Sequence, residues 1–171
     1  MPAVYHKTGE SFYTPRAKVT VNKAIVQFTG QSKETTTIPT KPTPTSYKIW
    51  ILAQSSYCLR WLWHAHGKGP YRLMPQAQPA QGNKAAKEAA LTPTQRVITT
   101  LISLLPPAIY HVYLDNLFSS PRLFRALRQQ GVGASGTYQK DSGINQTLVA
   151  EKVTEGQGIQ WGKIHRVNQF S

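Results

Sequence analysis

The chain has 171 residues, 40% of them hydrophobic, which suits one domain with a buried core and argues against a disordered protein. Twenty Lys and Arg residues against seven Asp and Glu residues give a net charge of +13, which favours a polyanionic partner such as nucleic acid. A single cysteine, Cys58, excludes an intrachain disulfide scaffold, and no apolar run reaches the roughly 20 residues of a membrane helix. We therefore expect an intracellular protein with no membrane partner.

The N-terminal part of the chain predicts an arm followed by a strand. Residues 1–18 lack periodicity and are interpreted as a disordered arm. Branched residues then alternate with polar ones over Val19–Phe28, which predicts a strand that ends before Gly30. Residues 32–46 are rich in Thr and Pro, and this composition predicts a loop.

Two further strands are predicted to form a β-hairpin. Tyr47–Gln54 is apolar on both faces, as in a central strand, and Tyr57–His66 follows after a short connection. In the second strand three large apolar residues are expected on one face: Leu59, Trp61 and Trp63. His64 and His66 would share the other face. Two ligands do not make a zinc site, so we interpret these histidines as ordinary strand residues.

A change of composition marks the middle of the chain. Residues 74–91 are rich in Ala, Gln and Pro and are interpreted as a flexible insertion. Thr92-Pro93 then predicts the start of a helix, and the apolar residues up to Leu105 suit packing against a sheet. Pro106-Pro107 ends this helix.

The segment from His111 to Gly131 predicts a strand, a turn and a helix. The strand Val112–Leu114 stops at Asp115-Asn116, a pair that favours turns. Ligands in open α/β sheets gather at the carboxyl ends of strands, which makes Asp115 a candidate site residue. On turn statistics alone, Asp115 more often shapes the turn through its own hydrogen bond.

The helix after this turn is predicted from its caps and its apolar face. Ser119 or Ser120 can cap it, Pro121 suits its first turn, and Gly131 ends it. Its apolar face holds Leu123, Phe124 and Leu127, and the opposite face holds Arg122, Arg125 and Arg128. The rest of the chain predicts a strand over 132–138, a short helix over 144–153, a strand over 158–167 and a tail over 168–171. Pattern alone supports an α/β or α+β fold.

Four segments resemble piggyBac-type transposases, in the order of that family. His111–Gly131 resembles the second-aspartate motif, Val19–Ser32 the first-aspartate strand, Lys41–Gln54 the strand that follows it, and Gly131–Asp141 the segment after the helix. The resemblance covers most of residues 19–167. It implies an α/β fold, a ribonuclease H-like mixed β-sheet flanked by helices and incomplete at the C-terminus, with a metal site of three aspartates.

The resemblance also implies which site residues are replaced. Asp115 stands at the second-aspartate position, but Asn22 stands at the first, followed by Lys23 where the family usually has Glu. Gln31 replaces a basic residue, and the third aspartate lies beyond the last residue of this sequence. Active relatives use Mg²⁺ or Mn²⁺, whereas we expect no bound cofactor here because one carboxylate does not hold two metal ions.

These observations predict a catalytically inactive fragment of a piggyBac-type DNA transposase, in the nucleus, that binds DNA nonspecifically and in a salt-sensitive way. The residues expected to contact DNA are Lys41, Lys48, Arg122, Arg125 and Arg128. The alternative is a domesticated binding protein without nuclease activity, in which Trp61 and Trp63 form an exposed patch. A nuclease that takes its missing carboxylates from a second chain ranks below both, and the oligomeric state stays open.

Overall fold

The computed structural model describes residues 13–30, 32–37, 39–40, 42, 44–65, 69–70, 90–139 and 143–153. The strands within these ranges are β1 (Lys18–Gln27), β2 (Thr36–Thr37), β3 (Thr45–Gln54), β4 (Tyr57–Ala65), β5 (Gly69–Pro70), β6 (His111–Leu114) and β7 (Gly133–Gly136). The helices are α3 (Pro93–Ser103), α4 (Pro121–Gln129) and α5 (Gln146–Val153). These bounds lie close to those of the predicted elements, except that β2 and the start of β3 lie in the predicted loop and β5 lies where no strand was predicted.

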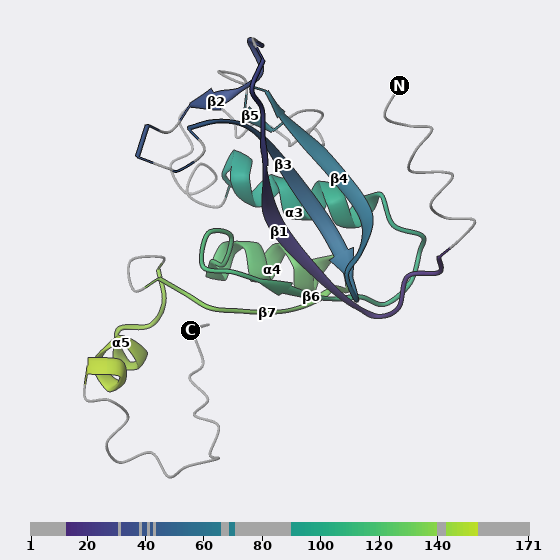
Figure 1. Ribbon diagram of the computed structural model, residues 1–171. Helices are drawn as coiled ribbons and strands as arrows, with labels where there is room; N and C mark the ends of the chain where they lie inside the picture. The colour runs from purple at the N-terminus through teal and green to yellow at the C-terminus, as the bar shows by residue number, and fades with distance from the viewer. Residues whose placement is uncertain are drawn as a thin grey trace, which may run out of the picture.

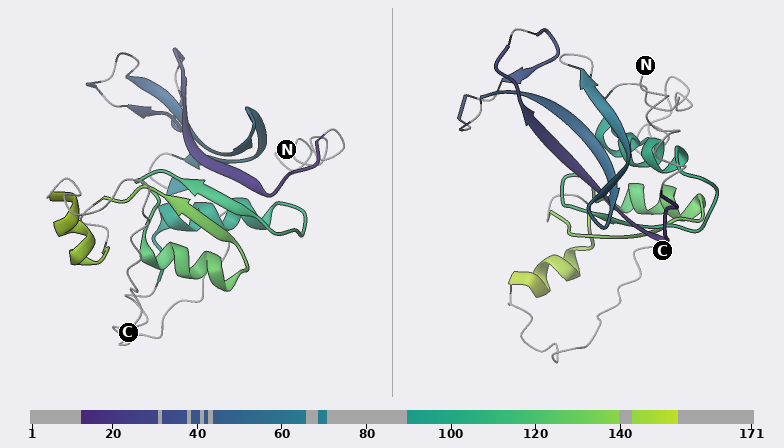
Figure 2. Two further views of the ribbon diagram at one scale, coloured as in Figure 1. Left: turned by 90° about the horizontal axis from the view of Figure 1, so that it is seen from below. Right: turned by 45° about the vertical axis from the view of Figure 1, so that its right-hand side comes forward.

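The strands form one mixed sheet with the order β5-β4-β3-β1-β6-β7, and β2 pairs with β3 outside this path. α3 and α4 lie side by side on one face of the sheet, whereas α5 lies apart from it (Figures 1 and 2). β1 pairs antiparallel with β3 and parallel with β6, so it joins the two halves of the sheet. This arrangement confirms the predicted α/β, ribonuclease H-like fold.

The core lies between the sheet and the two helices. Val21, Trp50 and Val112 point into it from three neighbouring strands, and Leu101 and Leu123 meet them from α3 and α4. Arg60 is also buried, at 2% exposed, and its Nε donates to the carbonyl oxygen of Leu104 at 2.7 Å. Because the last carbonyls of a helix lack partners within the helix, this guanidinium completes the C-terminal end of α3.

The hairpin of β3 and β4 contains a β-bulge that corrects one prediction. Ser55 and Ser56 both have positive φ, 47° and 67°, as the two-residue turn of a right-twisted hairpin requires. The pairing shifts between Leu52 and Ala53, so one residue of β4, Leu59, has no partner there. Such an extra residue reverses the alternation of faces. The predicted common face was therefore wrong: Leu59 is buried with Leu62, whereas Trp61 and Trp63 lie on the face opposite the helices.

Both helices begin and end where local signals predict. Thr92 and Gln95 form a reciprocal capping box at α3, and Ser120, one of the two predicted caps, accepts a hydrogen bond from the amide of Leu123 at 3.1 Å. α4 ends at Gln129, and Gly131, two residues later, has a φ of +73°. The amide of Val132 then donates to the carbonyl of Leu127 at 2.9 Å, which closes the helix end.

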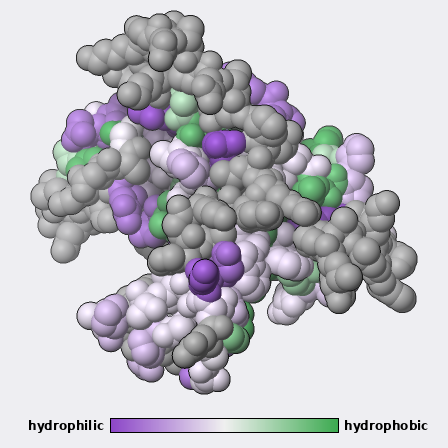
Figure 3. All heavy atoms as spheres, turned by 90° about the horizontal axis from the view of Figure 1, so that it is seen from above, coloured by the Kyte–Doolittle hydropathy of each residue, from purple (hydrophilic) through white to green (hydrophobic). Residues whose placement is uncertain are grey.

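Residues 13–17, assigned above to the arm, make defined contacts. Tyr13 stacks on Tyr57 with ring centroids 4.6 Å apart, and the carbonyl of Ala17 accepts a hydrogen bond from the amide of His111 at 2.7 Å. Residues 1–12, most of the predicted insertion and the predicted last strand and tail lie outside the described residues. Within the described part, no helix is long and apolar enough to cross a membrane. Seen from above, hydrophobic and hydrophilic residues form small interspersed patches (Figure 3).

Candidate active site

Asn22 and Asp115 occupy matching positions on two neighbouring strands. The parallel pairing of β1 with β6 aligns Thr20 with Tyr113 and Val21 with Leu114, and Asn22 and Asp115 follow directly. Alternation of side chains places both on the face of the sheet opposite the helices. Both are exposed. The residues at the first- and second-aspartate positions thus lie next to each other, Asn22 within β1 and Asp115 directly after the end of β6.

Asp115 also shapes its turn, as turn statistics favoured. Its Oδ1 accepts a hydrogen bond from the amide of Leu117 at 2.9 Å, and its carbonyl oxygen accepts one from the Ser119 hydroxyl at 2.9 Å. The strand end is packed closely against β7, because a Cβ at Gly136 would lie 2.6 Å from the carbonyl oxygen of Leu114. Glycine at position 136 therefore allows β7 to approach the end of β6.

The polar groups beside Asp115 do not form an acidic cluster. Asn22 uses its Oδ1 to accept a hydrogen bond from the amide of Lys23 at 2.7 Å. Lys23 points to the helix-covered face, where it lies near Lys48 on β3. Burial, together with the charge of Lys23, lowers the pKa of Lys48. The Lys48 ammonium lies 4.3 Å from the centroid of the Trp50 ring, a cation–π contact.

The sequence matches the transposase IS4 family over residues 4–168. The chain belongs to that family. Its fold is similar to that of a piggyBac transposase, solved as a synaptic complex with hairpin DNA, with a TM-score of 0.58 and 22% sequence identity. The match covers 80% of this chain and 26% of the piggyBac transposase chain, so this chain spans about a quarter of that protein. The fold is that of a piggyBac-type transposase domain, as the resemblance implied.

The described residues of this transposase-family chain do not fit the divalent metal ions implied by the resemblance. No group of three His, Cys, Asp or Glu side chains that could hold a metal ion occurs among them. Asn22 offers a neutral oxygen that already accepts a hydrogen bond, which leaves Asp115 as the only charged oxygen ligand at this point of the sheet. Mg²⁺ sites in proteins rely on carboxylates, because anionic ligands offset the loss of water.

The candidate metal pair of His64 and His66 is only half described. The ring of His64 packs edge-on against Trp50, with centroids 5.7 Å apart. His66 lies outside the described residues.

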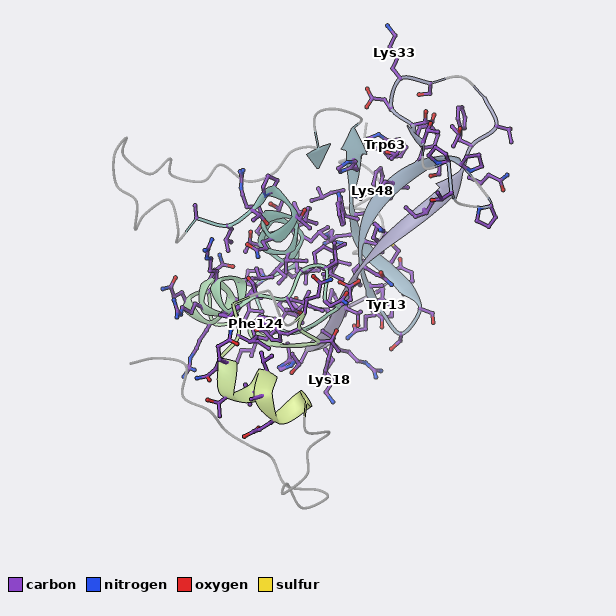
Figure 4. All side chains as sticks on the ribbon, turned by 90° about the vertical axis from the view of Figure 1, so that its left-hand side faces the viewer. Tyr13, Lys18, Lys33, Lys48, Trp63 and Phe124 are labelled. Atoms are coloured by element: carbon purple, nitrogen blue, oxygen red, sulfur yellow. The ribbon has the colours of Figure 1, made fainter. Side chains whose placement is uncertain are left out.

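Among the described residues, the cations predicted to contact DNA lie on two different elements, β3 and α4. Arg122, Arg125 and Arg128 are exposed on α4, whereas Lys48 is partly buried on β3 and Lys41 lies outside the described residues. Sequence analysis placed two further cations, Arg16 and Lys18, in the arm, but they line a pocket on the face that carries Asn22. The only sequence signal for them was their position at the start of a predicted strand. Figure 4 shows Lys18 well separated from Lys48 and Trp63.

Proposed function

We propose that this chain is a piggyBac-type transposase domain that lacks nuclease activity, binds DNA without sequence preference and acts in the nucleus. The observation that carries the proposal is that Asn22 and Asp115 directly follow the paired residues Val21 and Leu114, at the position where the resemblance implies two aspartates. This chain would then be a member of a family that cleaves DNA with carboxylate-bound metal ions, but one whose own domain lacks the carboxylates needed to bind them.

Electrostatics supports the absence of cleavage. Relative to the acidic pair that the resemblance implies, Asn22 and Lys23 change the local charge from about −2 to about +1. Two-metal cleavage needs anionic ligands that gather both ions and keep them beside the phosphodiester. The neutral amide of Asn22 supplies none of this negative charge, and Lys23, although its side chain points to the other face of the sheet, adds positive charge one residue away.

Charge supports the affinity for DNA. The net charge of +13 and the exposed arginines of α4 provide the cations that release counterions from a phosphate backbone. Nonspecific binding of this kind weakens as salt rises, with a logarithmic slope of about 0.9 for each phosphate neutralised. The affinity should depend on salt and not on base sequence.

Fluorescence anisotropy with the full 171-residue chain tests both parts of the proposal. Two labelled duplexes of unrelated sequence should bind equally well, and Kd should rise steeply with salt. The same duplexes incubated with Mg²⁺ or Mn²⁺ should stay uncut. Preference for one duplex or a Kd insensitive to salt would contradict nonspecific binding, and metal-dependent nicking by the wild-type chain would contradict inactivity.

A second candidate function is protein binding through an aromatic row on the face of the sheet opposite α3 and α4. The row is formed, in spatial order, by Phe28, Tyr47, Trp63 and Trp61, with neighbouring ring centroids 4.6, 4.9 and 6.3 Å apart. If the row serves a partner, Trp63→Ala should lower the free energy of unfolding by less than about 1 kcal/mol. The matched change in the core, Trp50→Ala, should cost about 3–5 kcal/mol. Equal losses would assign the row to the stability of the domain itself.

A further inference from the structure

A pocket of about 430 Å³ lies on the face of the sheet opposite the helices, the same face that carries Asn22. It is formed where β1 begins, next to the turn of the β3–β4 hairpin and the outward side of β6. The side chains that give it its chemistry are Arg16, Lys18, Thr20, Ser55 and Tyr113. Arg16, Lys18 and Tyr113 are exposed, so the pocket is open to solvent.

Buried hydrogen bonds hold the segment that carries the two cations. Gln54 is 7% exposed; its Oε1 accepts a hydrogen bond from the amide of Arg16 at 2.7 Å, and its Nε2 donates to the carbonyl oxygen of Lys18. Between them, the carbonyl of Ala17 accepts a hydrogen bond from the amide of His111. The backbone at both cations is therefore fixed against β3 and β6, which limits the entropy lost when a ligand binds.

The pocket has the chemistry of an anion site. Arg16 and Lys18 supply two positive charges, and Thr20, Ser55 and Tyr113 supply hydroxyl donors. None of the described residues that line it is acidic. Phosphate oxygens accept charge-assisted hydrogen bonds from guanidinium and ammonium groups, and the planar guanidinium can donate two of them in parallel.

We propose that this pocket binds one phosphate group of the DNA backbone. The inference rests on the proposed DNA affinity and locates part of it at a defined place. Lys18, Thr20 and Asn22 follow each other at alternate positions along β1, so their side chains share one face at a spacing of about 6–7 Å. A backbone that enters at the pocket therefore continues past Asn22 and Asp115, where the bond to be cut would lie in a domain with an intact metal site.

The position of the pocket along the proposed course of the DNA backbone favours DNA over a small phosphate compound as its ligand. The pocket opens onto the same exposed face as Asn22 and Asp115 and does not enclose its ligand. Its volume exceeds that of one phosphate group, so the attached sugar also fits. An open site with two fixed cations suits one unit of a longer polyanion, because neighbouring phosphates add to the affinity.

Charge-matched variants test the proposal. Lys18→Gln and Lys33→Gln each remove one positive charge from an exposed lysine, and the two side chains lie at opposite ends of the sheet (Figure 4). In the full-length chain, Lys18→Gln should raise Kd for a duplex about fivefold to tenfold at low salt and reduce the logarithmic salt slope by about 0.9. Lys33→Gln should change Kd less than about twofold. Arg16→Gln should match or exceed Lys18→Gln, because it removes a bidentate donor.

A variant that changes no charge tests the pocket with less risk of unfolding the domain. Tyr113→Phe removes one hydroxyl and no charge, and it should weaken DNA binding by about threefold. Equal effects of Lys18→Gln and Lys33→Gln would overturn the pocket and leave the DNA affinity to bulk charge. No binding of any duplex by the wild-type chain would instead contradict the proposed function. Stabilisation of the fold by inorganic phosphate in a Lys18-dependent way, with duplex binding unaffected by Lys18→Gln, would replace DNA with a free phosphate ligand.

Discussion

Gln95 donates a hydrogen bond from its Nε2 to the Oγ of Ser120, at 2.8 Å, and thereby joins the N-terminal ends of α3 and α4. The same side chain accepts a hydrogen bond from the amide of Thr92 at 3.1 Å, while Ser120 caps α4 by accepting one from the amide of Leu123. The first residues of both helices are thus linked by one continuous series of hydrogen bonds. These linked hydrogen bonds fix the two helices that support β6, the strand directly before Asp115.

Removal of Gln95 should destabilise both helix ends at once. Gln95→Ala deletes the bridge and half of the capping box, so the free energy of unfolding should fall by about 1–2 kcal/mol. Gln129→Ala, in an exposed position near the end of α4, is the control and should change stability by less than about 0.5 kcal/mol. Urea unfolding measures both. A loss equal to that of the control would mean that the two caps are independent.

Divalent metal should not stabilise the wild-type domain. A ligand that binds only the folded state adds RT ln(1 + [L]/Kd), about 1.4 kcal/mol at ten times Kd. We expect millimolar Mg²⁺ to leave the thermal midpoint unchanged. The variant Asn22→Asp, which brings a second carboxylate beside Asp115 on the same face, should acquire a rise in midpoint that depends on Mg²⁺, and an added Asp115→Ala change should remove that rise. A rise in the wild-type chain would show that it has metal ligands other than these.

Neutralising Asp115 should strengthen DNA binding. In the absence of metal its carboxylate repels a backbone on the same face, and a unit charge about 7 Å from a phosphate contributes about 0.6 kcal/mol in water. Asp115→Asn keeps an oxygen that can accept the hydrogen bond from Leu117, so Kd should fall about twofold to threefold at low salt with no loss of stability. Weaker binding by this variant when Mg²⁺ is present would instead indicate a metal bridge between Asp115 and DNA.

Tyr138 should make stability fall at alkaline pH. Burial raises the pKa of Tyr138 to about 12 from an ordinary value of 10.0, and its ring packs edge-on against Phe124. Since the folded state holds this proton more tightly than the unfolded state, its contribution is complete below pH 10 and is lost as pH rises towards 12. Tyr138→Phe should flatten the decline in that interval, measured by urea unfolding at each pH. An unchanged decline would assign it to other groups, such as Tyr110, whose pKa is also raised by burial.

The helices could be predicted because their signals are local. Thr92-Pro93, Ser120-Pro121 and Gly131 act within one turn of the residues that they cap or end. The proximity of Asn22 and Asp115 depends instead on the contact of two strands that lie far apart in sequence. Only the resemblance to a family pointed to it, since periodicity carries no information about which strands pair.

The faces of β4 could not be predicted from alternation. One extra residue at the bulge reverses the pattern, and its position depends on the partner strand β3. The same limit applies to Arg16 and Lys18. Their surroundings are set by Gln54 and His111, residues from two other strands, so a segment without periodicity of its own was interpreted as an arm.

The order of the strands also has a consequence for the synthesis of the protein on the ribosome. β1, β3 and β4 can pair with one another as soon as they leave the exit tunnel, but β6 emerges much later because the long segment up to residue 111 comes first. During that interval one edge of β1 has no strand beside it, and an unprotected edge can pair with a neighbouring chain. Translation speed between residues 65 and 111 should therefore influence how much of the protein aggregates while it is being made.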